Sequence, residues 1–451
     1  MARLEMKDAV YHFGRDHGGS SDQFALLAFD SVDGPAPTFA DVRAHVEARA
    51  PGIPGLRLRL KETLWGLDYP RWVRDDSAPR EHLVDHDLAG QNWDRFEEFV
   101  GELLRTRLDM RAQSWRLHLV RGVHGVPRVQ GAATVIILQV GHALTDGLGV
   151  TRLLRALFAA PEDRTIGIPL PGHPAQETRI RTWVNTARAL LCAPVDLAIS
   201  RWTASRALRA VLATPLPSSL PASSLNCAVS SARTVRIVPM PAEQCRAGSS
   251  TITVSALAAV GTCLSRYLRD VDGREGDLDV AAMVPIALPP RFAWAAANRV
   301  LMGTVDLHAD IEDPHDRRKQ IARSLEQERV RATTEPVLRL ARADDRVPAP
   351  IVRYVQGRRF RHRIRNPDRV AGQTTVVSVN RGAADLRLCG ARARFTAGFP
   401  FLEDGRAVTH GFFGLGETVT VSLVTCPTAL PSLRAHTEDL VNELRGPSNV
   451  G

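Results

Sequence analysis

The sequence lacks the features that mark a membrane-spanning or secreted protein. None of its 451 residues falls in an apolar run long enough to cross a bilayer, and the first ten, MARLEMKDAV, contain no apolar core of a signal peptide. Its six cysteines are scattered without a C-x-x-C pair, which argues against structural zinc and a disulfide framework. We therefore expect a cytoplasmic protein that needs no metal.

Lysine is scarce as well. Only Lys7, Lys61 and Lys319 are lysines, although Lys and Arg together number 58 and the formal net charge is +9. The arginines are spread along the chain and are not interleaved with aromatic residues, so the charge does not indicate a nucleic-acid partner. Arginine usage on solvated faces explains the charge most simply. The alternative is an anionic partner, either the phosphates of a cofactor or an anionic membrane surface.

The length predicts two domains, because one hydrophobic core rarely serves 451 residues. Apolar runs typical of strands lie at residues 24–29, 115–120, 134–140, 235–238, 280–285, 298–307, 374–379 and 419–424. Helical spacing occurs at residues 39–50, 93–107, 148–158, 179–213, 254–267, 313–330 and 430–444. Strands mixed with helices in both halves predict an α/β protein with an N-terminal domain at 1–175, a helical crossover linker at 176–230 and a C-terminal domain at 231–451.

The linker has its own composition. Loops rich in proline at residues 161–174 and 214–224 flank its helical stretch, where apolar residues alternate with arginines. These are Arg181, Arg188, Arg201, Arg206 and Arg209. Packing of this helix along another domain is the commoner arrangement. The alternative is that the helix rests on an anionic membrane.

The most informative stretch is residues 133–150, ATVIILQVGHALTDGLGV. A buried strand ends at Gly141-His142, and Asp146-Gly147 follows just before an amphipathic helix. His142 is thus at a strand-to-helix junction, where α/β proteins often place functional groups and where an imidazole could act as a general base. Asp146 could orient that imidazole, brace the loop through an arginine, or simply cap the helix. Gly147 would permit a tight bend, and His142 could also be a hydrogen-bonded core histidine.

The His-x-x-x-Asp-Gly pattern resembles the H-H-x-x-x-D-G hallmark of the bacterial wax ester synthase/diacylglycerol acyltransferase (WS/DGAT) family. That family lies within the coenzyme A-dependent acyltransferase superfamily of chloramphenicol acetyltransferase and peptide-synthetase condensation domains. Weaker similarities to the family's other motifs follow in the same order along the chain. They are Pro70-Arg71-Trp72 with His82, Leu108-Asp109 to Trp115, residues 223–233 (SSLNCAVSSAR), Asn298-Arg299-Val300 and residues 378–382 (SVNRG).

The chain also departs from that family pattern. Gly141 stands where the first histidine is usual, Gln113-Ser114 replaces Pro-Leu before Trp115, and Ser255-Ala256 replaces an Asn-Asp pair. Val379-Asn380-Arg381 replaces Asn-Val-Pro. Because the second histidine, the family's base, is retained as His142, the resemblance implies that acyl transfer is kept while the acceptor is left open.

The resemblance implies two chloramphenicol-acetyltransferase-like domains with a tunnel between them and His142 midway. It implies acyl-coenzyme A as a donor substrate, with no tightly bound cofactor, and a long-chain alcohol or diacylglycerol as the hydroxyl acceptor. In that scheme Asp146 braces the loop through Arg299. Substrate or oxyanion contacts fall to Gly147, Ser378 and Asn380, and structural support to Asn298, Arg299 and Trp115. Asn298 and Arg299 could equally be ordinary polar residues at a strand end, and Trp115 a core residue.

Three other functions stay open at this level. The enzyme could acylate a specialised metabolite, or it could use a donor bound to a carrier protein acting in trans. The chain could also be a non-catalytic lipid-binding relative. Retention of His142 favours a catalyst, and contact with a lipid surface is compatible with each of these functions.

Overall fold

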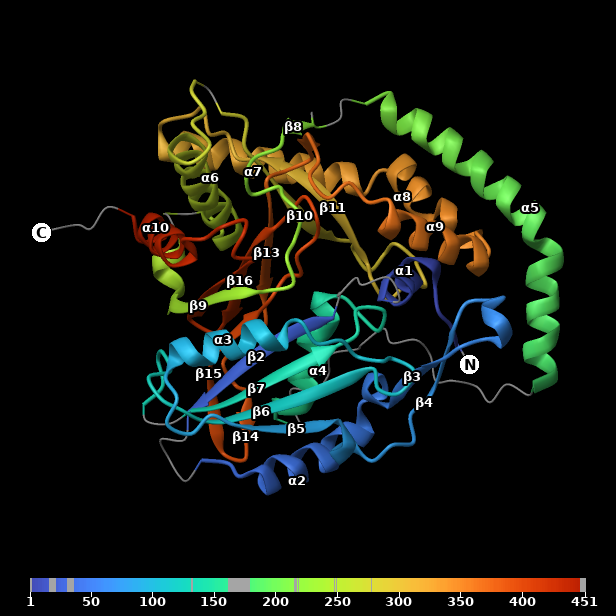
Figure 1. Cartoon of the computed structure of the whole chain (residues 1–451), viewed down its shortest axis with the longest axis horizontal. Helices are drawn as coiled ribbons and strands as arrows, with labels where there is room; N and C mark the ends of the chain where they lie inside the picture. The colour runs from blue at the N-terminus through green and yellow to red at the C-terminus, as the bar shows by residue number, and fades with distance from the viewer. Residues whose placement is uncertain are drawn as a thin grey trace, which may run out of the picture.

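A computed structural model describes residues 2–15, 22–30, 36–130, 133–160, 179–214, 217, 219–246, 248, 250–276 and 278–446. Two six-stranded sheets dominate it, one in each half of the molecule, and helices flank both (Figure 1). The predicted α/β class with mixed sheets flanked by helices is therefore confirmed.

The N-terminal sheet has the strand order β14–β15–β2–β7–β6–β5. Its strands are β2 (Gln23–Asp30), β5 (Leu83–Asp87), β6 (Trp115–Val123), β7 (Ala133–Val140), β14 (Arg387–Leu388) and β15 (Ala391–Gly398). All eight residues of β7 are buried, because Val135 and Ile137 face one apolar cluster while Ile136 and Leu138 face another. Burial on both faces explains why the sequence of this strand is apolar without alternation.

Four α-helices occur among the described residues of the N-terminal half. They are α1 (Met6–Arg15), α2 (Phe39–Arg49), α3 (Trp93–Leu103) and α4 (Gly147–Phe158). Thr38 caps α2 in a capping box with Asp41. The helix predicted at residues 93–107 ends at Leu103, and the sequence analysis did not predict α1.

The C-terminal sheet has the order β11–β10–β13–β16–β17–β9. Its strands are β9 (Thr234–Pro241), β10 (Ala281–Ala287), β11 (Val300–Asp306), β13 (Thr374–Asn380), β16 (Val408–Leu415) and β17 (Thr418–Thr425). The helices of this half are α6 (Ile252–Asp270), α7 (Pro314–Ala332), α8 (Glu335–Arg342), α9 (Ala349–Arg361) and α10 (Leu433–Arg445). Two small sheets, β1 (Ala2–Arg3)–β4 (Arg71–Arg74)–β3 (Leu58–Lys61) and β12 (Arg369–Val370)–β8 (Leu220–Pro221), complete the fold.

Two strands, β14 and β15, come from the C-terminal part of the sequence but lie in the N-terminal sheet. β15 belongs in sequence to residues 231–451, yet it pairs antiparallel with β2 in the N-terminal sheet, with Phe395 opposite Ala28. Pairing with β2 satisfies the backbone groups of an edge that would otherwise be open. A single cut at residue 231 therefore does not separate the two sheets.

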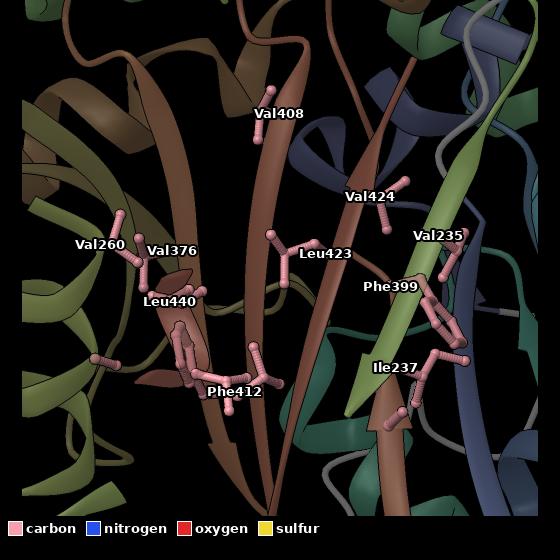
Figure 2. Packing of buried hydrophobic residues seen from close by; sticks show 14 of the residues in the cluster. Val235, Ile237, Val260, Val376, Phe399, Val408, Phe412, Leu423, Val424 and Leu440 are labelled. Carbon is pink, nitrogen blue, oxygen red and sulfur yellow. The ribbon is translucent and has the colours of Figure 1, made fainter. Parts of the chain in front are cut away.

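The core runs across the two halves. One apolar cluster contains Phe96 and Val100 of α3 together with residues of both sheets. Figure 2 shows Val235 and Ile237 of β9 near Phe399, the residue that follows β15. A shared core of this kind holds the halves together more firmly than the polar interfaces usual between domains.

The linker is largely one long helix, α5 (Arg179–Leu212), which forms an outer arc of the molecule (Figure 1). The predicted loop at residues 161–174 lies outside the described residues, and β8 lies within the loop predicted at 214–224. Within the described part of the chain, no helix combines the length and apolarity needed to span a membrane.

Candidate functional site

The candidate site is the turn that joins β7 to α4. The backbone N–H of Gly141 donates to the Ser114 carbonyl (3.0 Å), which ends the strand. Asp146 then caps α4, because its Oδ1 accepts the Gly149 N–H at 3.0 Å. His142 thus lies between a buried strand and a capped helix, at the junction that the sequence pattern predicts.

The imidazole of His142 is half-buried between aromatic side chains. Tyr11 of α1 stacks on it, with ring centroids 4.1 Å apart and an angle of 7° between the planes. Phe401 meets it edge-on at 5.9 Å. Nδ1 of His142 has no hydrogen-bond partner of good geometry among the described residues.

Burial sets the protonation state of this histidine. Loss of hydration disfavours the imidazolium, and this effect lowers the pKa of His142 to about 4, although the Asp146 charge acts in the opposite direction. The ring is therefore neutral at pH 7. A neutral imidazole has a nitrogen lone pair that can accept a proton from a substrate.

Asp146 connects the turn to the C-terminal half. Its Oδ2 accepts the backbone N–H of Arg299 at 3.1 Å. The Arg299 guanidinium instead lies against residues 289–294 and donates to main-chain carbonyls there, including those of Pro289 and Phe292. The structure thus brings together the pair that sequence reasoning chose, but the contact uses the backbone of Arg299 because its side chain is engaged by the 289–294 loop.

Asn298 forms a second connection. Its Nδ2 donates to the His142 carbonyl (2.7 Å) and to Oδ1 of Asp8 (2.8 Å). The Asp8 carboxylate also accepts the backbone N–H groups of Ala297 and Asn298, at 2.8 and 3.0 Å. Three N–H donors thus converge on one buried carboxylate, whose pKa burial raises to about 6.

Helix α1 supplies residues that the sequence analysis missed. Besides Asp8 and Tyr11, it provides Lys7, whose ammonium donates to the Val300 carbonyl and lies 4.5 Å from the centroid of the Trp294 ring. Burial lowers the pKa of Lys7 to about 8. The helical spacing of Met6, Ala9, Val10 and Phe13 was a signal for α1, but nothing local indicated where its polar residues would bind.

The tight bend expected at Gly147 does not require a glycine there. A Cβ at Gly147 would meet only Oε1 of Gln23, at an ordinary 3.9 Å. The tight position is Gly149, where a Cβ would lie 1.6 Å from Oγ1 of Thr145. Thr145 is buried within the turn and occupies the space beside the first turn of α4.

Gly141 occupies a crowded place. A Cβ there would lie 2.5 Å from Sδ of Met110 and 2.9 Å from its Cγ. The Met110 side chain therefore fills the space that a side chain at position 141 would need. Glycine at this position and methionine at 110 are sterically matched.

Ser378 and Asn380, which were expected near the oxyanion, differ in burial. Ser378 is half-buried, and its Oγ accepts a hydrogen bond from the Thr253 hydroxyl at 3.0 Å. Asn380 is exposed, and its Oδ1 accepts the N–H of Gly382 at 2.9 Å. Neither side chain has a recorded contact with His142 in the described part of the structure, so their assignment to substrate stays a prediction.

Trp115 lies in the core. It is 1 % exposed, its Nε1 donates to the Leu56 carbonyl at 2.9 Å, and His82 stacks on its ring at 4.3 Å. The side chain thus holds the start of β6 in place. The structural role predicted for it is compatible with these contacts.

A cavity of about 1130 Å³ lies in the C-terminal half, between the end of α5, β11 and α7. Its lining includes Val211, His308 and Arg323 but not His142. This cavity is therefore not the tunnel that the family resemblance implies, and that tunnel stays a prediction.

A much smaller cavity, of about 20 Å³, lies where the two halves meet. Asp22 and Phe24 line it from the N-terminal half, and Arg233 and Phe401 from the C-terminal half. Phe401 thus lines this cavity and also lies edge-on to the His142 ring.

No group of three metal-ligating side chains lies together in the described ranges of the chain. The His142 imidazole itself lies against the aromatic rings of Tyr11 and Phe401.

Comparisons with protein families match most of the chain. The wax ester synthase/diacylglycerol acyltransferase catalytic domain matches residues 22–255, and the WS/DGAT C-terminal domain matches residues 296–446. Two proteins of Mycobacterium tuberculosis, both provisionally named diacylglycerol O-acyltransferases, are similar in sequence. One is 26% identical over 387 residues, covering 76% of this chain and 70% of its own length, and the other is 28% identical over 337 residues, covering 70% of each.

Solved structures share the fold. A wax ester synthase/diacylglycerol acyltransferase from Marinobacter aquaeolei VT8 superposes with a TM-score of 0.64 at 16% identity, covering 98% of each chain. A starter condensation domain of rhizomide synthetase, in complex with C8-CoA, gives 0.56 at 13% identity and covers 98% of this chain and 94% of that one. Both are two-lobed, and the two-domain architecture implied by the sequence motifs is confirmed.

The two glycines of the turn provide a matched test. We expect Gly149→Ala to lower the free energy of unfolding by about 1–3 kcal/mol, because the new methyl group displaces buried Thr145. Gly147→Ala has room and should leave stability unchanged or raise it slightly, since alanine favours helix. Urea unfolding of both variants measures the difference, and equal stabilities would contradict the packing described for the turn.

Proposed function

This chain belongs to the wax ester synthase/diacylglycerol acyltransferase family of acyltransferases, and we propose that it moves an acyl group from acyl-coenzyme A to a hydroxyl acceptor with His142 as general base. The observation that carries the proposal is a neutral imidazole whose backbone is fixed by both halves of the molecule. A base must be unprotonated and held in place before the substrate arrives.

The proposed reaction needs no covalent enzyme intermediate. His142 accepts the hydroxyl proton as the acceptor oxygen attacks the thioester carbonyl, and a tetrahedral intermediate forms. That intermediate collapses as the carbon–sulfur bond breaks, and the imidazolium returns its proton to the departing thiolate. The products are an ester and free coenzyme A.

The tetrahedral intermediate carries an oxyanion, which requires a hydrogen-bond donor. Ser378 is our candidate, because its Oγ accepts from Thr253 and so keeps its own proton available to donate. Removal of one such donor typically slows an acyl transfer by about a hundredfold to a thousandfold. Asn380 and Gly147 are weaker candidates, since Asn380 is exposed and already binds its own turn.

The donor thioester is proposed to approach from the side of the small cavity. Arg233 lines that cavity, and its pKa is lowered by burial and also by the nearby charges of Arg105 and Arg107. Arginines held close together favour an anionic ligand, and coenzyme A carries several phosphate charges. The complex of the rhizomide synthetase condensation domain with C8-CoA supports a coenzyme A donor by analogy of fold.

For the acceptor we propose a long-chain alcohol or diacylglycerol, giving a wax ester or a triacylglycerol. The family and the names of the mycobacterial relatives support these acceptors. A specialised hydroxyl-bearing metabolite is the second candidate. It is favoured by one local observation, the matched pair of Gly141 and Met110 at a position where the family motif usually has histidine.

The general-base proposal predicts the result of His142→Gln, which keeps a planar polar side chain but supplies no base. We expect acceptor-dependent release of coenzyme A to fall by about 10²–10⁴-fold, while the KM for the thioester changes little. The measurement uses octanoyl- and palmitoyl-coenzyme A with hexadecanol, diacylglycerol or no acceptor. His124→Gln, at an exposed histidine, is the control, and unchanged turnover in His142→Gln would exclude this role.

We propose that Asp8 positions His142 through Asn298, and this role predicts that kcat depends on pH. Above pH 6 its carboxylate accepts three N–H groups, and protonation near its pKa of about 6 removes acceptor capacity, so kcat should fall as the pH drops through 6. His142 titrates lower, near 4, and should give no inflection at 6.5. In Asp8→Asn we expect kcat at pH 8 to fall about tenfold with KM unchanged, and the inflection near 6 to vanish. An inflection that persists in this variant contradicts the assignment.

The arginines beside the small cavity, Arg105, Arg107 and Arg233, predict different effects on the KM values of two acyl donors. In Arg105→Gln/Arg233→Gln the KM for octanoyl-coenzyme A should rise about tenfold, because the phosphates lose their partners. The KM for octanoyl-pantetheine, which has no phosphate, should not change. Arg95→Gln, at an arginine of α3 paired with Glu98, is the matched control. Equal effects on both donors would contradict phosphate binding at this place.

A further inference from the structure

The linker helix α5 has one side buried and one side in solvent. The buried side chains face the neighbouring α8 region, where Ser200 Oγ donates to Asp344 at 3.4 Å. The buried residues whose side chains the structure describes are Thr186, Ser200, Ala207 and Val211. Figure 1 shows the opposite side of this arc turned away from the rest of the molecule.

The outward side of α5 is unusually apolar. Its exposed large apolar residues are Trp183, Val184, Leu191, Val195, Ile199, Trp202, Leu208 and Leu212. Leu191, Val195 and Trp202 recur four and seven positions apart, which places them on one side of an α-helix. Leu191 is 81% exposed and Trp202 62% exposed. An outward helix face in a water-soluble protein is normally polar, so a face of this kind indicates a partner.

The charges on this face are almost all positive. Arg188, Arg201, Arg206 and Arg209 are exposed on the helix, and Asp196 is the only acidic residue in its 34 positions. The Arg206 guanidinium lies 4.9 Å from the centroid of the Trp202 ring, so cation and aromatic ring are presented together.

Tryptophan and arginine among aliphatic side chains are typical of a helix that lies in the membrane interface. The rings and aliphatic groups enter the headgroup boundary, and the guanidinium groups bind lipid phosphates. We propose that the outward face of α5 docks the enzyme onto an anionic phospholipid surface, with the helix parallel to the bilayer.

The positive charge of α5 favours a lipid surface over a second copy of the chain as the partner. In a symmetric dimer the same face would meet itself, so the arginines of one copy would approach those of the other with few carboxylates to neutralise them. An anionic bilayer neutralises them directly. The proposal does not depend on the proposed chemistry, because binding to lipid can be measured without turnover.

The test is co-sedimentation of the purified full chain with vesicles of phosphatidylcholine alone or mixed with phosphatidylglycerol. We expect the wild-type chain to partition onto the anionic vesicles at least tenfold more strongly than onto the neutral ones. Leu191→Glu/Val195→Glu/Trp202→Glu should lose this binding. Arg188→Gln/Arg206→Gln/Arg209→Gln should lose most of the preference for anionic lipid.

A matched control introduces three glutamates at exposed apolar residues outside α5. Tyr354→Glu/Val355→Glu/Ile364→Glu also replaces three exposed apolar residues, but outside α5, and should bind vesicles as the wild-type chain does. Absence of wild-type binding, or equal loss in both triple variants, would overturn the proposal. So would a wild-type dimer, seen by sedimentation equilibrium, that the α5 variant alone dissociates without any change in lipid binding.

Turnover of a water-soluble acceptor separates this proposal from the catalytic one. The α5 variant should keep that turnover, because the substituted residues are exposed on α5, which forms the outer arc of the molecule, whereas His142 lies in the turn between β7 and α4. Retained turnover with lost vesicle binding supports the docking face. If no acceptor is turned over by any variant, the chemistry fails while the vesicle result still decides the docking face.

Discussion

The hydrogen bonds of Asn298 are the constraint on which the site depends. Its side chain joins the carbonyl of His142, which belongs to the N-terminal half, to the carboxylate of Asp8 on the first helix. Because Asp8 and Asn298 are almost fully buried, no solvent molecule replaces a lost bond between them cheaply. The position of the imidazole therefore depends on how the two halves and α1 pack against each other.

Two larger features keep that arrangement rigid. β15 leaves the C-terminal part of the chain and completes the N-terminal sheet beside β2, and an apolar cluster runs from one sheet to the other without interruption. Separation of the halves would expose this cluster and break a strand pairing at once. Rigid support of this kind suits a base that must be positioned before the substrate binds.

The same burial that holds His142 also sets its chemistry. Stacking on Tyr11 and contact with Phe401 remove water from the ring, and the lowered pKa keeps the imidazole neutral. Asp146, which sequence reasoning placed beside it as a possible partner, accepts the backbone N–H of Gly149 in α4 and that of Arg299 in the C-terminal half. Asp146 thus holds the backbone of the turn in place, while His142 carries the nitrogen proposed to act as the base.

The sequence by itself determined the local structure of this protein. The apolar run of β7, the Thr38 and Asp146 caps and the position of His142 at the end of a strand all follow from interactions within a few residues, so local patterns report them. Motifs in a fixed order also indicated the family before any contact was known. Tertiary structure decided the rest, because it depends on pairings between residues far apart in the chain. Asp8 meets Asn298 across 290 positions, β15 joins the opposite sheet, and which side of α5 is exposed among the described residues is set by what packs beneath it.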